Sequence, residues 1–290
     1  MLGNECQGGD CCESLLVPGG SFYRGYDGVT SGHTSRDYPA TVSDFRLDKY
    51  PVTTGRFRRF VSAVVGGWRP LGGWGRHAHV NDGGGLMGTN SDVELGWNQD
   101  WNSQLAATDA EWNANLLHQG AALAAWSETP GSKEARAINF VTWYEAYAFC
   151  IWDGGFLPSD AEWNYAAAGG DEQRVYPWST PPSSELVDCS YGLYLGCTAS
   201  SADVGTHSPK GDGRFGQVDL VGGGYAWNLD FTGDYSTPCI DCTNTKLAGG
   251  KSARGAALGS SRDAYLVSAR MGGVPTARED WFGARCARRP

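Results

Sequence analysis

The chain lacks the features that most directly mark a membrane protein or a nucleic-acid-binding protein. No apolar run approaches the length that spans a bilayer. The formal net charge is -9, and no block of Lys and Arg covers a domain-sized face, so the clustered positive charge that neutralises a phosphate backbone is missing. The start, Met1-Leu-Gly-Asn-Glu-Cys6, has neither the basic nor the apolar segment of a signal peptide. We therefore expect no transmembrane segment and no nucleic-acid partner, and we expect any signal peptide or anchor to be absent from this sequence.

Residues that form turns and aromatic anchors are abundant. The 290 residues include 42 glycines, 13 prolines and 12 tryptophans. Gly and Pro set tight turns, and large aromatic side chains hold loops against a core. Because 41% of the residues are hydrophobic, the chain can bury a large core. This composition predicts an irregular, loop-rich architecture rather than long helices.

Nine cysteines favour an oxidising compartment, because cytosolic proteins seldom carry so many without a metal-binding pattern. We therefore expect an extracellular, periplasmic or cell-surface protein. The spacing supports two local disulfides, Cys189 with Cys197 and Cys239 with Cys242. A zinc site built from these four cysteines is the alternative.

The other cysteine patterns are less regular. A thioredoxin-like Cys239/Cys242 pair would need a strand before it and a helix after it, and the sequence indicates neither. Cys6, Cys11 and Cys12 form an odd set, which predicts one unpaired thiol or a partner outside this chain.

We interpret residues 1–14 as a flexible, cysteine-bearing tail and residues 15–290 as one domain. Its early part predicts strands in Leu16–Arg24, where Pro-Gly-Gly interrupts, and in Ala40–Leu47, which alternates like a half-buried strand. A helix then follows Thr53 or Thr54 as its cap. Its apolar positions recur at Phe57, Phe60, Val61 and Val64.

Residues 66–136 form a Trp- and Gly-rich insertion and are the least regular part of the chain. Trp97, Trp101 and Trp112 would either line a carbohydrate or peptide cleft or hold the long loops against the core.

His77 and His79 are the candidate metal ligands of this insertion. On an extended segment both imidazoles share one face. Because no third ligand stands at a recognisable spacing, a pair of surface histidines is the alternative.

The longest motif lies in two consecutive segments. They are Asn139-Phe-Val-Thr-Trp-Tyr-Glu-Ala-Tyr-Ala-Phe-Cys-Ile-Trp152 and Phe156-Leu-Pro-Ser-Asp-Ala-Glu-Trp-Asn-Tyr-Ala-Ala-Ala-Gly-Gly170. Together with Asp48-Lys-Tyr-Pro-Val-Thr53 and Phe282-Gly-Ala-Arg-Cys-Ala-Arg288, they resemble the signatures of the formylglycine-generating enzyme (sulfatase-modifying factor) family.

The second of these segments is also coherent as a helix. Ser159 and Glu162 have the spacing of a capping box, in which each side chain bonds the other residue's backbone N–H. Trp163, Ala166 and Ala167 share one face of the helix that follows.

The resemblance covers most of residues 15–65 and 137–290. It implies a mixed α+β, irregular and loop-rich fold, which is an elaborated relative of C-type lectin folds. In the family the helical cysteine pairs with the one near the C-terminus, which implies a Cys150–Cys286 disulfide.

The family's calcium site is altered in this sequence. The family's Asn and Glu ligand positions correspond to Gly223 and Ala226, so two oxygen donors are lost. Calcium needs six to eight oxygens, and calcium binding would require Asp219, Asp230 and Asp234 to replace the missing ones.

The same resemblance argues against the family's best-known activity. Arg254-Gly-Ala-Ala-Leu258 and Ser268-Ala-Arg270 also resemble family motifs, and the family places its copper-binding cysteines between these two, whereas residues 256–285 contain no cysteine. An ungapped comparison puts the two thiols near Gly259–Tyr265, and hydroxyl or guanidinium groups cannot replace a thiolate on cuprous copper. We therefore expect no copper-dependent oxidation and name no catalytic residue. Ser260 or Ser261 would act in acyl transfer only with His207 nearby.

The candidate ligand-binding residues are varied side chains of this C-terminal region. They are Ser260, Arg262, Asp263, Tyr265, Arg270, Arg278, Glu279, Asp280 and Trp281. Proteins with C-type-lectin-like folds display ligand contacts there, and Arg, Tyr and Trp are frequent binding anchors. We hypothesise a secreted or surface-attached, non-catalytic, monomeric recognition module that binds a protein, peptide or glycan.

Three alternatives stand beside this hypothesis. The first is an oxidative enzyme of the same superfamily with a metal held by His77, His79 and carboxylates. The second is a diversity-generating variable protein, because that class places its variable residues in the same region. The third is a structural paralogue whose changed motifs only repack a decayed pocket.

Overall fold

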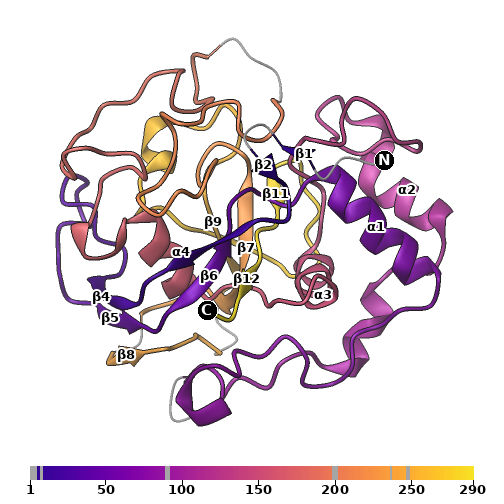
Figure 1. The fold of residues 1–290 in the computed structure, drawn as a ribbon, viewed down its shortest axis with the longest axis horizontal. Helices are drawn as coiled ribbons and strands as arrows, with labels where there is room; N and C mark the ends of the chain where they lie inside the picture. Colours follow the sequence, from indigo (N-terminus) through magenta and orange to yellow (C-terminus); the bar gives the residue numbers. More distant parts are fainter. Residues whose placement is uncertain (1–4, 7–8, 89–91, 198–201, 236, 246–248) are drawn as a thin grey trace.

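The computed structural model describes residues 5–6, 9–88, 92–197, 202–235, 237–245 and 249–290 (Figure 1). Its regular elements are short and joined by long loops, which confirms the expected mixed α+β, loop-rich architecture. The α-helices are α1 (Thr54–Val65), α2 (Asp109–Leu117), α3 (Trp143–Trp152) and α4 (Asp160–Ala167). Short 3-10 helices are η1 (Asn81–Gly83), η3 (Gln99–Gln104), η4 (His118–Gly120), η5 (Gly170–Glu172) and η6 (Arg262–Tyr265).

The central sheet has the strand order β10-β9-β7-β11. Its strands are β7 (Tyr225–Phe231), β9 (Lys251–Arg254), β10 (Met271–Gly273) and β11 (Phe282–Gly283). The β11 strand runs parallel to β7, and the other pairs are antiparallel. Helices α3 and α4 both contact β7, so the two helices of the longest sequence motif pack directly on the sheet that carries the C-terminal segments.

Three smaller sheets surround this centre. One has the order β12-β6-β3, with β3 (Ser14–Val17), β6 (Phe45–Asp48) and β12 (Ala287–Arg288). The second has the order β4-β5-β8, with β4 (Gly20–Tyr23), β5 (Pro39–Val42) and β8 (Cys239–Ile240). The N-terminal pair is β1 (Glu5–Cys6) with β2 (Gly9–Asp10). In Figure 1, β4, β5 and β8 lie on the side of the molecule opposite α1 and α2.

The single strand expected over Ala40–Leu47 is wrong, because β5 and β6 belong to different sheets. The chain turns at Ser43 and Asp44. The backbone N–H of Ser43 donates to Asp241 Oδ1 at 2.6 Å, and Asp44 Oδ1 accepts from the backbone N–H of Gly19 at 2.7 Å. These two bonds hold the turn at which the chain passes from one sheet to the next.

The predicted helix caps are confirmed. Thr53 caps α1, and its hydroxyl oxygen accepts from the backbone N–H of Arg56 at 3.3 Å. The predicted apolar positions of α1 are buried. In α4, Ser159 Oγ accepts from the Glu162 N–H at 3.1 Å and Glu162 Oε2 accepts from the Ser159 N–H at 2.7 Å, which completes the capping box.

The structure forms the expected disulfides. Cys150 and Cys286 link α3 to the C-terminal segment across 136 residues. The two local pairs, Cys189–Cys197 and Cys239–Cys242, are also bridged, so they leave no thiolates for the alternative zinc site.

The three N-terminal cysteines form one disulfide and leave one free thiol, as predicted. Cys6 and Cys11 form a disulfide, and Cys12 keeps a free thiol. Cys11 is buried, and its carbonyl accepts from Arg56 Nη1 at 3.0 Å. The described part of this segment therefore packs on the domain, and the proposed boundary at residue 15 stays a prediction.

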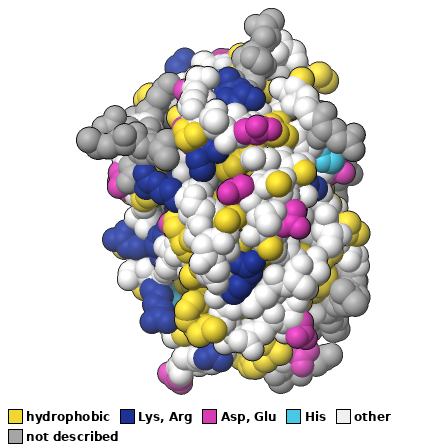
Figure 2. All heavy atoms as spheres, turned by 90° about the vertical axis from the view of Figure 1, so that its right-hand side faces the viewer, with side chains coloured by type: hydrophobic (Ala, Val, Ile, Leu, Met, Phe, Trp, Pro, Cys, Tyr) yellow, Lys and Arg dark blue, Asp and Glu magenta, His cyan; other side chains and the backbone are white. Residues whose placement is uncertain are grey.

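Charges of both signs are interspersed with apolar side chains on the face drawn in Figure 2. No block of one sign covers that face, in keeping with the net charge of -9. Within the described ranges, no helix combines the length and the apolar character that crossing a membrane requires.

Candidate functional site

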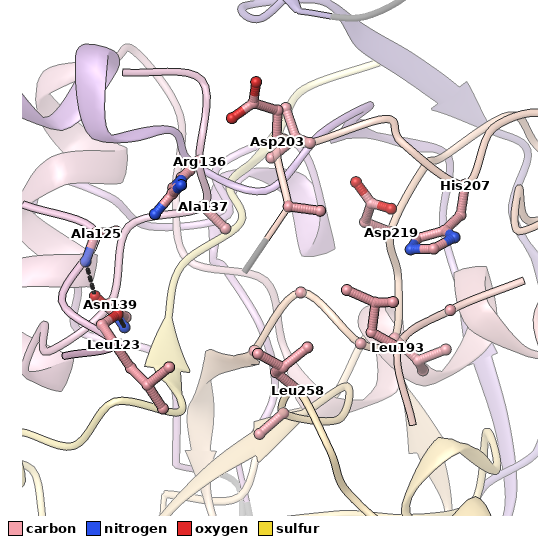
Figure 3. Close-up of a pocket in the computed structure, with 18 of the residues that line it drawn as sticks. Leu123, Ala125, Arg136, Ala137, Asn139, Leu193, Asp203, His207, Asp219 and Leu258 are labelled. Carbon is pink, nitrogen blue, oxygen red and sulfur yellow. Dashed lines mark hydrogen bonds between the residues drawn. The ribbon is translucent and has the colours of Figure 1, made fainter. Parts of the chain in front are cut away.

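A cavity of about 100 Å³ lies beside a triplet of glycines where two C-terminal segments meet (Figure 3). The backbone N–H groups of Gly222 and Gly224 donate to Ala256 O at 2.9 and 3.1 Å, and the Tyr225 N–H donates to Trp281 O at 2.7 Å. We call this the glycine-floor cavity. These bonds to Ala256 and Trp281 place the cavity in the C-terminal region, where the sequence predicted ligand binding.

The glycines of the floor are required by backbone geometry. Gly222 has φ +90° and Gly224 has φ +108°, a region that residues with a Cβ rarely adopt. A Cβ on Gly222 would also lie 2.9 Å from the Tyr265 hydroxyl oxygen. A side chain at this position would therefore strain the backbone and collide with the neighbouring ring.

Polar and apolar side chains line the walls of the glycine-floor cavity. The polar ones are Arg136, Asn139, Asp203, His207, Asp219 and Asp280, and the apolar ones include Leu123, Leu193, Val204, Val221 and Leu258. Figure 3 shows the Asp219 carboxylate beside the His207 ring. Burial raises the pKa of Asp219, although its Oδ2 accepts from the Gly205 N–H at 2.6 Å.

The described lining residues supply no hydroxyl, thiol or lysine nucleophile. None of the described residues around the glycine-floor cavity is Ser, Thr, Cys or Lys, so His207 has no hydroxyl or thiol there to activate. Ser260 and Ser261 do not line the cavity with His207. The geometry therefore gives no support to the acyl-transfer alternative.

The segment at the family's copper position does not fit copper. Gly259–Tyr265 contains a turn and the 3-10 helix η6, with Arg262 and Asp263 exposed. Every cysteine except Cys12 is in a disulfide, and Cys12 lies in the N-terminal segment beside Arg56. Cuprous copper needs soft thiolate donors, and this segment offers none.

Six of the candidate ligand residues come from two segments that each contribute a lining residue, Leu258 or Asp280, to the glycine-floor cavity. Ser260, Arg262 and Asp263 come from one segment, and Glu279, Asp280 and Trp281 come from the other. Arg262 Nη2 donates to the Tyr194 hydroxyl at 3.3 Å. Asn139 Nδ2 donates to the Asp280 carbonyl at 3.0 Å, and the Trp281 side chain is 37% exposed. We call these six residues the C-terminal face.

Two other candidates, Tyr265 and Arg270, contact neighbouring side chains of the fold. Tyr265 is fully buried, because its ring packs over Gly222 and against Tyr194. Arg270 lies over the Tyr235 ring at 4.1 Å and donates to Gly233 O. These two side chains are therefore not displayed on the C-terminal face.

Arg278 serves as an anchor for its own loop. Its Nη1 and Nη2 donate to the two carboxylate oxygens of Glu145 at 2.9 and 2.6 Å, and Nη1 also donates to Phe140 O at 2.6 Å. Glu145 is fully buried at the start of α3. A ligand could recruit the Arg278 guanidinium only by breaking this bidentate pair.

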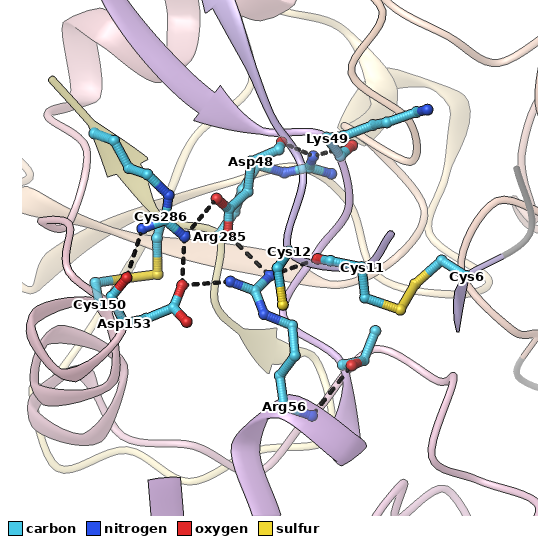
Figure 4. A network of polar contacts seen from close by, with 12 residues as sticks. Cys6, Cys11, Cys12, Asp48, Lys49, Arg56, Cys150, Asp153, Arg285 and Cys286 are labelled. Atoms are coloured by element: carbon cyan, nitrogen blue, oxygen red, sulfur yellow. Dashed lines mark hydrogen bonds and ion pairs between the residues drawn. A yellow bond between two sulfur atoms is a disulfide. The ribbon is translucent and has the colours of Figure 1, made fainter. Parts of the chain in front are cut away.

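Gly223 and Ala226, which stand at the family's Asn and Glu calcium ligands, line a small pocket together with Arg285, and a guanidinium there does not fit calcium. Arg285 Nη1 donates to the carbonyls of Asp48 and Lys49 at 2.8 Å (Figure 4). Its Nη2 donates to the carbonyls of Val218 and Asp219 at 2.6 and 2.8 Å. A fixed guanidinium on these carbonyls repels a second cation. In the part of the chain that the structure describes, no cluster of His, Cys, Asp or Glu could hold a metal ion.

Two of the carboxylates that would have replaced the calcium ligands are already engaged. Asp230 Oδ2 accepts from the Asp160 N–H at 2.8 Å, and its Oδ1 accepts from the Asn244 N–H at 2.6 Å. Asp219 bonds Gly205. These oxygens stabilise the backbone of neighbouring loops.

His77 also has partners on both ring nitrogens. Nδ1 lies 2.9 Å from Glu94 Oε1, and Nε2 lies 3.0 Å from Glu162 Oε2. Burial opposes the charged form, but the carboxylates of Glu162 and Glu94 outweigh it and raise the pKa of His77 to about 10. A protonated imidazole cannot bind a metal, which removes the proposed His77 ligand. The expectation that His77 and His79 form a surface pair is also wrong, because His77 is fully buried.

The three insertion tryptophans separate into two roles. Trp97 and Trp112 are buried in the core, as expected for residues that hold loops in place. Trp101 is half-buried and lines a second, larger cleft next to Trp143. Lys251 also lines that cleft, and sequence reasoning missed it because a lysine three residues before Arg254 looks like an ordinary strand residue.

A family model described as the sulfatase-modifying factor enzyme 1-like domain matches residues 2–290. Among similar curated proteins, the Inactive C-alpha-formylglycine-generating enzyme 2 of Bos taurus is 29% identical over 305 residues, covering 98% of this chain and 90% of that protein.

Two solved structures share the fold. PvdO from Pseudomonas aeruginosa has a TM-score of 0.63 at 18% identity and covers 96% of this chain and 94% of its own. Treponema denticola variable protein 1 has a TM-score of 0.60 at 17% identity and covers 96% of this chain and 95% of its own. At these identities the likeness shows the fold alone, and it agrees with the architecture expected from the sequence.

Proposed function

The chain belongs to the sulfatase-modifying factor enzyme 1-like family, and from that premise we propose that it is a non-catalytic recognition protein that binds a ligand through its C-terminal face. One observation carries the proposal: the segment at the family's copper position, Gly259–Tyr265, holds no thiol and presents exposed polar side chains instead. A scaffold that keeps its fold and lacks its catalytic groups is suited to binding.

The relative from Bos taurus supports the absence of catalysis. Its name describes an inactive enzyme, and it aligns with nearly the whole chain. Two observations on the described residues support the same absence: both ring nitrogens of His77 already have carboxylate partners, and no Ser, Thr, Cys or Lys lines the glycine-floor cavity. The oxidative alternative is therefore not supported by the geometry at His77.

The C-terminal face suits a polar ligand with some apolar surface. Arg262 is exposed and offers a guanidinium, while Asp263, Glu279 and Asp280 offer carboxylates. Trp281 adds a partly exposed indole, and its backbone carbonyl accepts from the Tyr225 N–H next to the glycine triplet. Such a mixture recognises a protein, peptide or glycan, with Arg262 and Trp281 as the main anchors.

The disulfides indicate the compartment in which the protein would meet such a ligand. Four disulfides are stable in an oxidising compartment, so we place the protein outside the cytosol, secreted or attached to the cell surface. We propose that it acts there as a monomer.

Binding screens with matched variants test the proposal. The labelled protein would be applied to glycan and peptide arrays, and hits would be measured again with Arg262→Ala and Trp281→Ala. Controls are Arg289→Ala and Trp74→Ala, which remove exposed Arg and Trp side chains outside the C-terminal face. We expect the two face variants to weaken binding about tenfold or more and the controls to leave it unchanged. Equal effects of both pairs would place the ligand elsewhere.

The variable-protein alternative makes a different prediction from the same face. If the gene belongs to a diversity-generating system, the coding DNA of residues between Arg254 and Cys286 will match a nearby template repeat except at adenine-derived positions. A coding region without such a repeat removes this alternative and leaves the C-terminal face as a fixed binding surface.

A further inference from the structure

A second cleft, of about 650 Å³, lies on another part of the molecule and shares no described lining residue with the glycine-floor cavity. Its aromatic wall comes from η3 and α3, with Trp101, Trp143, Tyr144 and Tyr147. The ends of β7 and β9 supply Phe231 and Lys251, and the loop residues Val93, Leu95 and Pro275 complete the apolar part. We call it the aromatic cleft.

The aromatic rings of this cleft pack against one another. Trp101 meets the Trp143 ring edge-on at 5.3 Å and lies tilted to Tyr144 at 5.8 Å. Trp143 is buried, whereas Trp101 and Tyr144 are half-buried. Ring surface therefore remains exposed on Trp101 and Tyr144, where a planar ligand can pack.

Lys251 places an amine in this aromatic wall. The side chain is almost completely buried, and Nζ donates to the Leu229 carbonyl at 2.8 Å. Nζ also lies 3.7 Å from the centre of the Phe231 ring and 4.1 Å from the centre of the Trp143 ring. Among the described residues, no carboxylate forms an ion pair with Nζ, and Asp230 acts on it only at longer range.

The positive charge of a Lys251 ammonium would be only partly balanced by its surroundings. Burial lowers the pKa of Lys251 to about 7, and the charge of Asp230 offsets this only in part. The two aromatic faces favour the ammonium but supply less energy than an ion pair. A ligand with one negative charge would complete the environment and hold the amine in its protonated form.

Two features of the lining limit the class of ligand. One positive charge matches one carboxylate, whereas a phosphate monoester would bring a second negative charge toward the lining carboxylates of Asp92 and Glu94 and toward Asp230 near Lys251. A cationic ligand is disfavoured because Lys251 already occupies the ring faces of Phe231 and Trp143. Thr245 Oγ1 is buried in the same lining without a hydrogen-bond partner in the described part of the chain.

We propose that the aromatic cleft binds an aromatic monocarboxylate, whose ring packs on Trp101 and Tyr144 and whose carboxylate accepts a hydrogen bond from the Lys251 ammonium. The Thr245 hydroxyl gives the ligand a second polar contact. The cleft volume lies within the range of pockets that enclose drug-sized molecules. This site is independent of the C-terminal face, so either can fail without the other.

The test uses naphthoate as the probe and naphthylmethanol as its neutral counterpart. Binding to the full chain in slightly acidic buffer would be followed by calorimetry and by quenching of tryptophan fluorescence. We expect naphthoate to bind about tenfold more tightly than the alcohol. Lys251→Met should remove this preference, while Trp101→Leu should weaken both probes by a similar factor.

The wild-type protein and the Trp101 variant keep the test decisive even if Lys251→Met does not fold. Trp101 is half-buried where it packs against the core, and Trp101→Leu keeps an apolar side chain at that position. Equal affinity for naphthoate and the alcohol overturns the proposal, as does naphthoate binding that Trp101→Leu leaves unchanged. Failure of naphthoate to bind at millimolar concentration overturns it as well.

Discussion

The Arg254 guanidinium binds the Asp160 carboxylate through two parallel hydrogen bonds, with Nε 2.7 Å from Oδ1 and Nη2 2.8 Å from Oδ2. Both residues are buried. Arg254 Nη1 also donates to the carbonyls of Val267 and Ala269 at 3.1 Å. One side chain of β9 thus joins the start of α4 to the segment that leads to the C-terminal face.

Replacing Arg254 by Lys should destabilise the fold. A lysine cannot form the bidentate pair, and it leaves the Asp160 carboxylate and several carbonyls without donors. We expect the free energy of unfolding to fall by about 3 kcal/mol in a chemical denaturation experiment. The matched control Arg289→Lys, at an exposed position, should change it by less than about 0.5 kcal/mol. Similar values for both variants would contradict the role given to Arg254.

Removing the Cys150–Cys286 disulfide should cost more than removing a local one. The bridge spans 136 residues, whereas Cys239–Cys242 spans 3. In the loop-entropy model the double replacement of Cys150 and Cys286 by Ser costs about 5 kcal/mol, against about 2 kcal/mol for the local pair. Thermal unfolding of the two double variants checks this order, and the reverse order would contradict it.

A Cβ on the floor of the glycine-floor cavity should be costly. Gly222→Ala combines a positive φ with a contact of 2.9 Å to the Tyr265 hydroxyl. We expect a loss of about 2 kcal/mol in unfolding free energy and weaker binding at the C-terminal face. Gly131→Ala is the control, because nothing lies within 4 Å of a Cβ there. A Gly222 variant as stable as the control would show that the floor can move.

Much of this architecture follows from local sequence. The caps at Thr53 and Ser159 were predictable because a side-chain cap, and at Ser159 the capping box, needs only residues three positions apart. The fold and the Cys150–Cys286 bridge followed from the long motif and its resemblance to the family. Local pattern could not show that the chain changes sheet at Ser43, because the alternation continues across that turn.

The site was harder to predict because its important contacts join distant residues. Arg278 was expected to face a ligand, but it pairs with Glu145, 133 positions away. His77 was a candidate metal ligand, and its partner Glu162 lies 85 positions further on. Tyr265 stands in a polar segment, yet its ring fills the space over Gly222. No sequence spacing encodes such pairs.

His77 should make a stabilising contribution that is lost in alkaline solution. Its pKa rises from 6.5 to about 10 on folding, so the contribution is complete below pH 6.5 and disappears as the pH rises to about 10. The folded state holds a proton in this window that the unfolded state has released, and stability falls by at most about 1.4 kcal/mol per pH unit.

The pH dependence that Lys251 contributes to stability has the opposite sign, because burial lowers its pKa to about 7 and folding then releases a proton.

To cancel the Lys251 contribution, the measurement is the difference in unfolding free energy between the wild type and His77→Gln, followed from about pH 6.5 to about pH 10. We expect the difference to shrink as the pH rises. An NMR titration of the wild-type ring is the second readout, and a pKa near the ordinary 6.5 would contradict the buried pairing with Glu94 and Glu162.

The most direct measurement is a cuprous copper titration combined with a cysteine-oxidation assay. The purified chain would be incubated with cuprous copper, oxygen and a peptide carrying a sulfatase-type cysteine motif, beside an active formylglycine-generating enzyme as positive control. Because Gly259–Tyr265 offers no thiol, we predict no stoichiometric copper binding at that segment and no aldehyde by mass spectrometry. Conversion of the peptide cysteine to an aldehyde would contradict the non-catalytic account.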